Sequence, residues 1–123
     1  MLLNLSNHSV VNWSDKQLKI AEEQFGKTVD IPFPQINPQA DETEIIELAK
    51  SYFSVCKEKI NNSDDKVNAV HLMGEYTFVF ALANMLINSG VTCVVSTTER
   101  NTVEIGGKKI SEFKFVKFRK YYS

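Results

Sequence analysis

Three short polar segments each follow an apolar run, and their side chains suit the binding of a small phosphorylated ligand. They are Ser6-Asn7-His8, Met73-Gly74-Glu75 and Ser96-Thr97-Thr98-Glu99-Arg100. Hydroxyl groups bond phosphate or ribose oxygens, and the Arg100 guanidinium can hold a phosphate through two parallel hydrogen bonds. The imidazole of His8 can act as a general acid or base, or donate to a phosphate. The three segments together predict one ligand site.

The segment around Gly74 has two interpretations. Glycine lets the backbone turn tightly and lets a ligand approach it, and the helix-start amides around Glu75 and Thr77 favour an anion. Alternatively, Gly74 only closes a turn between a strand and a helix, and Glu75 only interacts with the helix dipole. The sequence contains no Gly-x-Gly-x-x-Gly motif and no Walker-type lysine, so it carries no phosphate-binding fingerprint.

The other two segments also have simpler interpretations. Residues 96–100 can be a solvated loop in which Glu99 and Arg100 form a surface ion pair of little energetic weight. His8 is a lone histidine in a polar loop, whereas His71 lies inside a predicted strand and is interpreted as a packed core residue with satisfied nitrogens. No other His, Cys or acid falls at a metal-ligand spacing, and no Ser-His-Asp arrangement is visible. We therefore expect neither a metal nor another cofactor.

Strands that alternate with helices must position these segments. The apolar runs predict strands at 1–6, 29–33, 67–73 and 91–95, with helices at 15–25, 41–60 and 76–88 between them. Ser14 can cap the first helix, and Gln17 can complete a capping box with it. A polar loop is expected to begin at Ser96. Gly106-Gly107 then predicts a tight hairpin between 102–105 and 109–121.

This alternation is typical of a parallel sheet with right-handed crossovers. We expect a small α/β, Rossmann-like, three-layer domain whose sheet has the order 2-1-3-4, extended by a C-terminal antiparallel β-hairpin. In such sheets ligands bind beyond the carboxyl ends of the strands, where the strand order reverses. Here the reversal falls between strands one and three, and all three polar segments lie at that end.

The bulk composition limits the classes of protein. With 123 residues the chain fits one domain, 1–123, and its net charge of −1 argues against broad binding to long nucleic acid or to anionic membrane. No apolar run approaches the length of a membrane span, and the first residues do not resemble a signal peptide. Cys56 and Cys93 are expected to be buried thiols. The protein is expected in the cytoplasm.

Two further features have structural explanations. Residues 76–88 form a helix that is apolar nearly all round, which is typical of a core or of a dimer face. The last segment carries a basic patch that most simply forms a solvated strand face, made up of Lys114, Lys117, Arg119 and Lys120.

The opening Leu5-Ser6-Asn7-His8, together with the Rossmann-like layout, resembles the compact CRISPR-associated proteins related to CARF sensory domains. That group includes ring nucleases and ligand-sequestering proteins of type III CRISPR systems. Residues 71–78 and 96–100 also resemble segments of small bacterial proteins of this kind. The resemblance implies a homodimer that binds a cyclic oligoadenylate across its two-fold axis. It also implies metal-independent cleavage, in which a ribose 2′-hydroxyl attacks the adjacent phosphate.

Transferred to this sequence, the resemblance implies a role for each polar segment. Gly74, Glu75 and Thr77 would cradle a phosphate. The cyclic oligoadenylate ring would be lined, and the charge of the transition state stabilised, by Ser96, Thr97, Thr98 and Arg100. The residues beside the reacting ribose would be Ser6, Asn7 and His8. Glu75 and Glu99 do not fit a site for a polyanion, because they bring negative charge to it. This charge leaves room for a catalytic carboxylate. The implied catalytic set is His8, Arg100 and Glu75.

The resulting hypothesis is a homodimeric protein that binds a cyclic oligoadenylate and either degrades or sequesters it. Two alternatives stay open. One is an enzyme of the same fold that processes another nucleotide or a sugar phosphate. The other is a protein-interaction module that uses the phenylalanine-rich helix and the terminal hairpin.

Overall fold

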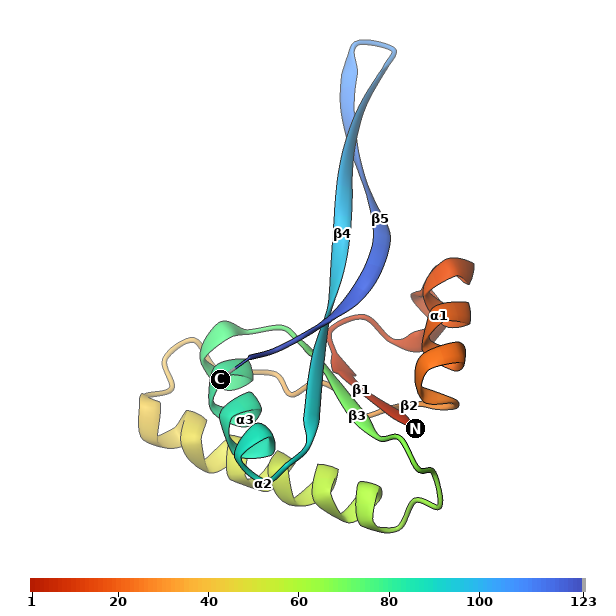
Figure 1. Cartoon of the computed structure of the whole chain (residues 1–123). Coiled ribbons are helices and arrows are strands. Elements are labelled where there is room, and N and C mark those ends of the chain that lie inside the picture. Colours follow the sequence, from red (N-terminus) through yellow and green to blue (C-terminus); the bar gives the residue numbers. More distant parts are fainter. Residues whose placement is uncertain (123) are drawn as a thin grey trace.

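A five-stranded sheet forms the centre of the molecule, and its strand order is β2-β1-β3-β4-β5. The computed structural model describes residues 1–122. β1 (Leu2–Ser6) pairs in parallel with β2 (Thr28–Asp30) and β3 (Ala69–Met73), and β3 pairs in parallel with β4 (Thr92–Ile105). β5 (Lys108–Lys120) is antiparallel to β4 (Figure 1). The predicted fold class and strand order are confirmed.

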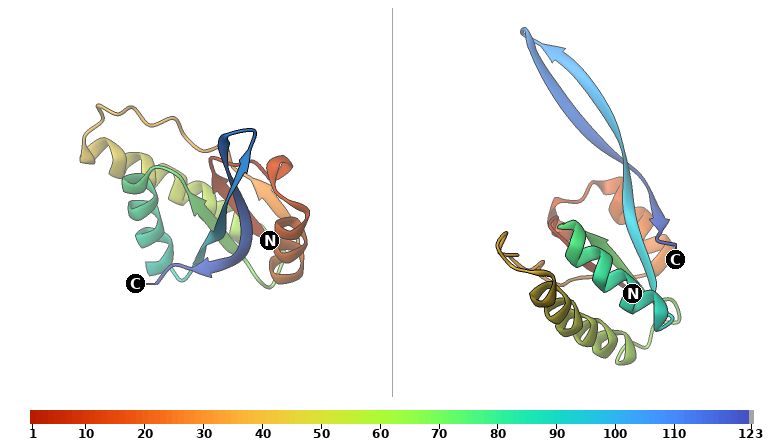
Figure 2. Two further views of the ribbon diagram at one scale, coloured as in Figure 1. Left: turned by 90° about the horizontal axis from the view of Figure 1, so that it is seen from above. Right: turned by 90° about the vertical axis from the view of Figure 1, so that its left-hand side faces the viewer.

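Helices cover both faces of this sheet and make three layers. α1 (Asp15–Phe25) lies on one face, preceded by the short 3-10 helix η1 (Val10–Asn12). α2 (Glu42–Asn61) and α3 (Tyr76–Asn88) lie against each other on the opposite face (Figure 2). No helix within residues 1–122 is both long and apolar enough to cross a bilayer.

The two faces of the sheet carry different side chains, because successive residues of a strand point to opposite sides. Toward α2 and α3 the strands present apolar residues that form the larger core, including Leu3, Leu5, Val70 and Leu72. Cys56 and Cys93 are buried free thiols in this core, as predicted. Toward α1 the same strands carry a smaller apolar cluster and three buried polar side chains, which are those of Asn4, Ser6 and His71.

The segment predicted as a polar loop at residues 96–100 is instead strand, and that prediction is wrong. β4 continues through it to Ile105 and pairs with β5 from Val94 onward, with one irregularity between Thr97 and Thr98. The two strands leave the body of the sheet as a long two-stranded arm, which closes at Gly106-Gly107 (Figure 1). Both glycines have positive φ, +59° and +79°, as the predicted tight hairpin turn requires. Backbone pairing with β5 therefore overrides the loop-like composition of the segment.

Two other strands are shorter than predicted. β2 ends at Asp30 and not at Phe33, because Pro32 and Pro34 have no N–H to offer to a sheet. β3 begins at Ala69 and not at Val67. The third helix has the predicted bounds, and the basic residues 114, 117, 119 and 120 are exposed on β5 as predicted.

Gly74 lies where an aromatic ring leaves no room for a side chain. A Cβ atom placed on Gly74 would overlap with the ring of Phe33, which packs edge-to-face against Phe78 at a centroid distance of 5.3 Å. The loop after β2 is thereby fixed against the turn between β3 and α3.

We therefore expect Gly74→Ala to lower the free energy of unfolding by about 1–3 kcal/mol, measured by urea denaturation, because the ring must shift or the turn must distort. In a background that carries Phe33→Ala the same substitution should cost much less. If the losses in the free energy of unfolding caused by the two substitutions are additive, the proposed overlap is contradicted.

Candidate functional site

A chain of hydrogen-bonded side chains crosses the α1 face of the sheet from β2 to β4. Asn4 donates from Nδ2 to Asp30 Oδ1 at 2.8 Å, and its Oδ1 lies 2.8 Å from His71 Nδ1. The other ring nitrogen, His71 Nε2, lies 2.7 Å from Ser96 Oγ. Strand register brings these groups together, because Asn4 pairs with His71, and His71 pairs with Val94, two residues before Ser96.

The direction of each hydrogen bond follows from the chemistry of Asn4. Its Nδ2 donates to Asp30 and to the His8 carbonyl, both at 2.8 Å, so Oδ1 must face His71 and can only accept. His71 therefore carries its proton on Nδ1, and Nε2 is free to accept from the Ser96 hydroxyl. Gln17 Nε2 in turn donates to Ser96 Oγ at 3.0 Å. The serine hydroxyl thus donates to an imidazole and accepts from an amide.

The surroundings of His71 keep its ring neutral. Burial, followed by the neighbouring His8, lowers the pKa of His71 to about 4. Trp13 and Phe118 pack edge-on against the ring at centroid distances of 5.2 and 5.6 Å. At neutral pH a lone pair on Nε2 is therefore directed at the Ser96 hydroxyl.

A cavity of about 390 Å³ opens over this chain of groups, where β3 ends and β4 passes through Ser96 and Thr98 toward the arm. Ser96 forms part of its wall, next to His71, and no carboxylate belongs to the described lining. The lining combines two imidazoles, two hydroxyls, two amides, a thioether and two aromatic rings, from His8, Asn12, Trp13, Gln17, His71, Met73, Ser96, Thr98 and Phe113.

Only some of the predicted site residues meet at this cavity. His8, Ser96 and Thr98 line it, and Ser6 belongs to the hydrogen-bond chain beneath it through Asn4 Oδ1, 2.8 Å away. Asn7 is exposed in the loop after β1. Thr97 donates its hydroxyl to the Lys117 carbonyl of β5 at 3.2 Å.

Arg100 and Glu99 lie farther along the arm, since each strand residue advances the chain by about 3.3 Å. The Arg100 guanidinium donates to Ser111 Oγ at 3.1 and 3.3 Å and lies 5.9 Å from the ring centroid of Phe113. Within residues 1–122 it forms no ion pair with Glu99, contrary to the simpler interpretation of this segment. Arg100 thus lies next to Phe113, an aromatic residue of the cavity wall.

The turn after β3 uses its own carboxylate at the start of α3. Glu75 accepts from the amides of Thr77 and Phe78 at 3.1 and 2.9 Å, and from the Thr77 hydroxyl at 2.7 Å. The hydrogen bond from the Thr77 side chain, followed by that from Phe78, lowers the pKa of Glu75. A phosphate at this helix start would have to displace Glu75 from these amides.

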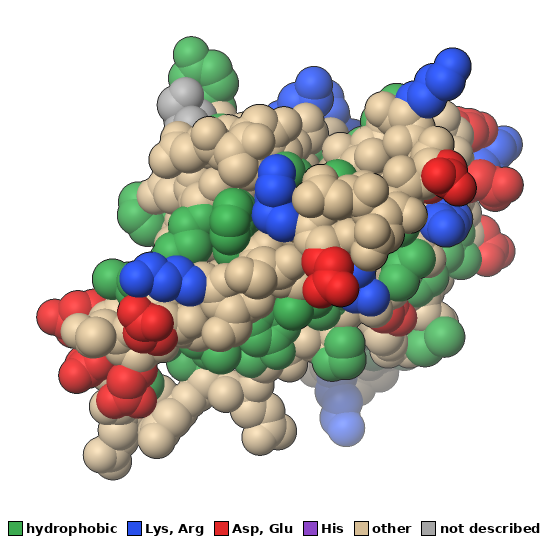
Figure 3. Space-filling view, turned by 90° about the horizontal axis from the view of Figure 1, so that it is seen from below, with side chains coloured by type: hydrophobic (Ala, Val, Ile, Leu, Met, Phe, Trp, Pro, Cys, Tyr) green, Lys and Arg blue, Asp and Glu red, His purple; other side chains and the backbone are tan. Residues whose placement is uncertain are grey.

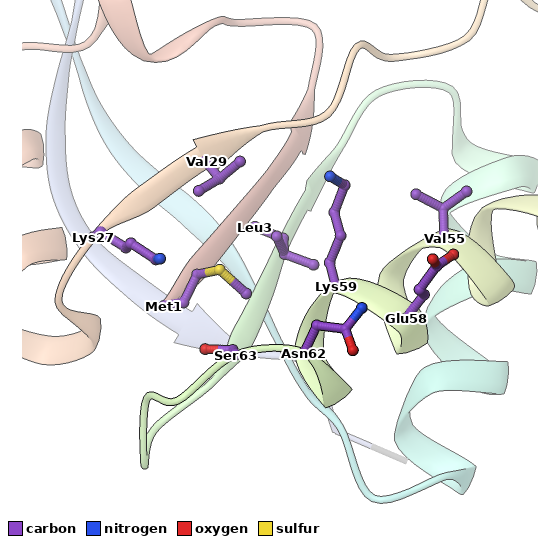
Figure 4. Close-up of a pocket in the computed structure, with 9 residues that line it drawn as sticks. All are labelled: Met1, Leu3, Lys27, Val29, Val55, Glu58, Lys59, Asn62 and Ser63. Carbon is purple, nitrogen blue, oxygen red and sulfur yellow. The ribbon is translucent and has the colours of Figure 1, made fainter.

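Larger hollows lie away from the hydrogen-bond chain. One, of about 550 Å³, is found at the opposite ends of the strands, between the start of β1 and the end of α2 (Figure 4). Lys59 and Glu58 of α2 line it, and the face seen from below carries scattered charges of both signs (Figure 3). The second is an apolar groove of about 680 Å³ along α3, bordered by Tyr76, Phe80 and Tyr122.

The sequence alone did not identify the residues at the centre of this site. His71 was predicted to be a core residue with satisfied nitrogens, which is confirmed, but its partners Asn4 and Ser96 were not foreseen. Gln17 was predicted to complete a capping box. Instead Ser14 Oγ accepts from the Gln17 amide, while the Gln17 side chain reaches Ser96. A usable signal was present: Asn4 and His71 are polar residues inside otherwise apolar strands.

A comparison with models of protein families identifies the family of the chain. The model of the uncharacterized protein MJ1673 family matches residues 1–119. The chain belongs to the MJ1673 family. No curated protein and no solved structure matches it. In this MJ1673-family chain, no cluster of three or more His, Cys, Asp or Glu within residues 1–122 could hold a metal ion.

The lowered pKa of His71 has a consequence for stability. Because the unfolded chain binds a proton near pH 6.5 and the folded chain only near pH 4, stability is full above pH 6.5 and is lost as the pH falls toward 4. We expect this group alone to reduce the free energy of unfolding by about 2 kcal/mol between pH 7.5 and pH 5. Denaturant titrations should show a smaller loss in His71→Gln and most of the loss in His8→Gln, because burial contributes more than His8 to the lowered pKa of His71. An equal loss in all three proteins would contradict the assignment.

Proposed function

We propose that this MJ1673-family protein binds a nucleotide at the cavity over Ser96, and that its ligand is a cyclic oligoadenylate shared between two copies. The observation that carries the proposal is the lining of the cavity, which offers hydrogen-bond donors and aromatic rings without a carboxylate. His8 and Thr98 can donate to phosphate and ribose oxygens. Phe113, which is 66% exposed, offers a face on which a base can stack.

The charge balance of the cavity supports an anionic ligand better than the sequence suggested. Glu75 and Glu99, which seemed to bring negative charge to the site, are absent from the described lining. Glu75 is committed to the start of α3, and Glu99 lies on the arm. Arg100 stands beside Phe113, where its cation can approach a phosphate next to a stacked base.

The size of the cavity supports sharing of a ring between two copies. At about 390 Å³ it lies in the lower part of the range for small-molecule sites, which suits one nucleotide and not a whole ring. A symmetric ring suits a symmetric dimer, because each copy then holds an equivalent nucleotide. The resemblance to CARF-related CRISPR-associated proteins supports the same choice of ligand.

The apolar groove along α3 supplies a face for the second copy. Tyr76 and Phe80 are 89% and 71% exposed on this helix, and Tyr122 lies beside them. Exposed aromatic residues grouped around a groove are typical of a protein interface. The N-terminus of α3 and the cavity both follow the carboxyl end of β3, so a two-fold axis near α3 that runs along the strands would keep both cavities at the same end of the dimer.

The binding proposal is tested by titrating cyclic oligoadenylates of several ring sizes into the protein in a calorimeter. We expect binding of one ring per two chains, weakened about tenfold by Phe113→Ala and by His8→Ala. Ser54→Ala, on the exposed side of α2, should bind as the wild type does. If no ring binds, or if a sugar phosphate or mononucleotide competes with every ring, the choice of ligand is wrong.

The fate of the ligand is a separate outcome of the same experiment. Chromatography after incubation with EDTA would show linear products for a metal-independent ring nuclease and intact rings for a sequestering protein. Light scattering should give a dimer that Phe80→Asp dissociates. A monomer with and without the ligand would contradict the shared site and would favour a protein-interaction role for the groove.

A further inference from the structure

The hydrogen-bond chain beneath the cavity contains more than ligand binding needs. Contacts with a nucleotide require donors at the surface of the cavity, yet His71 is only 1% exposed and places an unprotonated nitrogen 2.7 Å from the Ser96 hydroxyl. On its other side the ring donates to Asn4, which is itself tied to Asp30. A serine, a neutral histidine with its acceptor nitrogen on the serine, and an amide that fixes the tautomer are the parts of an activated nucleophile.

We propose that Ser96 is a nucleophile toward a phosphorus ester, with His71 as its general base and Asn4 as the positioning residue of His71. The inference rests on the proposed function only for the choice of a phosphorus ester as the electrophile.

Burial divides the roles among these groups. His71 is almost fully buried and borders the cavity only at its edge, whereas Ser96 is partly exposed and offers its hydroxyl to a ligand. Trp13 and Phe118 leave the imidazole little freedom to rotate, since both pack edge-on against it. A nucleophile held in place by its base loses little entropy in reaching the reactive geometry.

The reaction balances without a cofactor. Ser96 Oγ attacks phosphorus, the Oγ–P bond forms and the hydroxyl proton moves to His71 Nε2. The bond from phosphorus to the leaving oxygen breaks, and that oxygen receives the proton from Nε2. Water then attacks phosphorus, gives its proton to Nε2 and breaks the P–Oγ bond, after which Nε2 returns the proton to Oγ. Gln17 and His8 are placed to donate to the phosphoryl oxygens during both steps.

The test uses a fluorophosphonate, which reacts with an activated serine by loss of fluoride and contains no nucleotide. Mass spectrometry should find one adduct, on Ser96, that is absent in Ser96→Ala and unchanged in the exposed-serine control Ser54→Ala. His71→Gln should slow the labelling at least about 100-fold while the circular dichroism spectrum stays that of a folded protein. Labelling elsewhere only, or labelling of Ser96 at the wild-type rate in folded His71→Gln, would overturn the proposal.

If His71→Gln does not fold, the role of His71 is tested instead by the pH dependence of the labelling rate of the wild-type protein. The titratable groups that reach this network are His8, from the loop beside the cavity, and Asp30, through Asn4 from β2. Uncharged side chains make the other contacts, from α1, β4 and β5. Because burial lowers the pKa of His71 to about 4, the labelling rate should be constant from pH 8 to about pH 5.5. A fall with a midpoint near 6.5 would contradict His71 as the base.

Failure of this inference is distinguishable from failure of the proposed function. A protein that binds cyclic oligoadenylate tightly but leaves Ser96 unlabelled would retain the ligand site and lose the nucleophile. A protein that is labelled at Ser96 but ignores every ring would retain the nucleophile and need another phosphorus ester as its substrate.

Discussion

The buried amide of Asn4 is the group on which the arrangement of the α1 face depends. An asparagine amide has two N–H groups and two acceptor lone pairs, and here all four are used, by Asp30, the His8 carbonyl, Ser6 and His71. Loss of this one side chain would leave several buried polar groups without partners, each at a cost of about 1–3 kcal/mol. The same amide therefore fixes the tautomer of His71 and the path of the loop that carries His8.

The Asn4 amide reaches all of these partners only because the register between β1 and β3 is fixed. Parallel pairing sets Asn4 beside His71, and a slip of β1 by one residue would turn Asn4 toward the apolar layer of α2 and α3, away from His71. The apolar residues on the other side of β1 resist such a slip, because Leu3 and Leu5 would then face the polar layer. The large core thus holds the register, and the register assembles the polar chain.

The order of the strands and helices was predictable because it rests on local patterns. Apolar runs alternating with amphipathic segments imply parallel strands, and this places His8, Ser96 and Thr98 at one end of the sheet. The arm was not predictable in the same way. Residues 96–100 have the composition of a loop, and only their pairing with β5 makes them a strand that carries Arg100 away from the sheet. Nor can a sequence show that Asn4 and His71, 67 positions apart, are hydrogen-bond partners.

The buried polar side chains of the described residues, Asn4, Ser6 and His71, all lie on the α1 face of the sheet, and this concentration points to a use beyond packing. On the opposite face the same strands are covered by helices with apolar residues alone. On this face Leu2, Trp13 and Phe118 already form an apolar cluster that side chains other than Asn4 and His71 could extend. A buried histidine here reduces stability as the pH falls, since its charged form is excluded. The polar residues lie where the α1 layer meets the cavity. The residues that reduce stability at low pH are therefore the same ones that place a neutral imidazole against a hydroxyl within reach of a ligand.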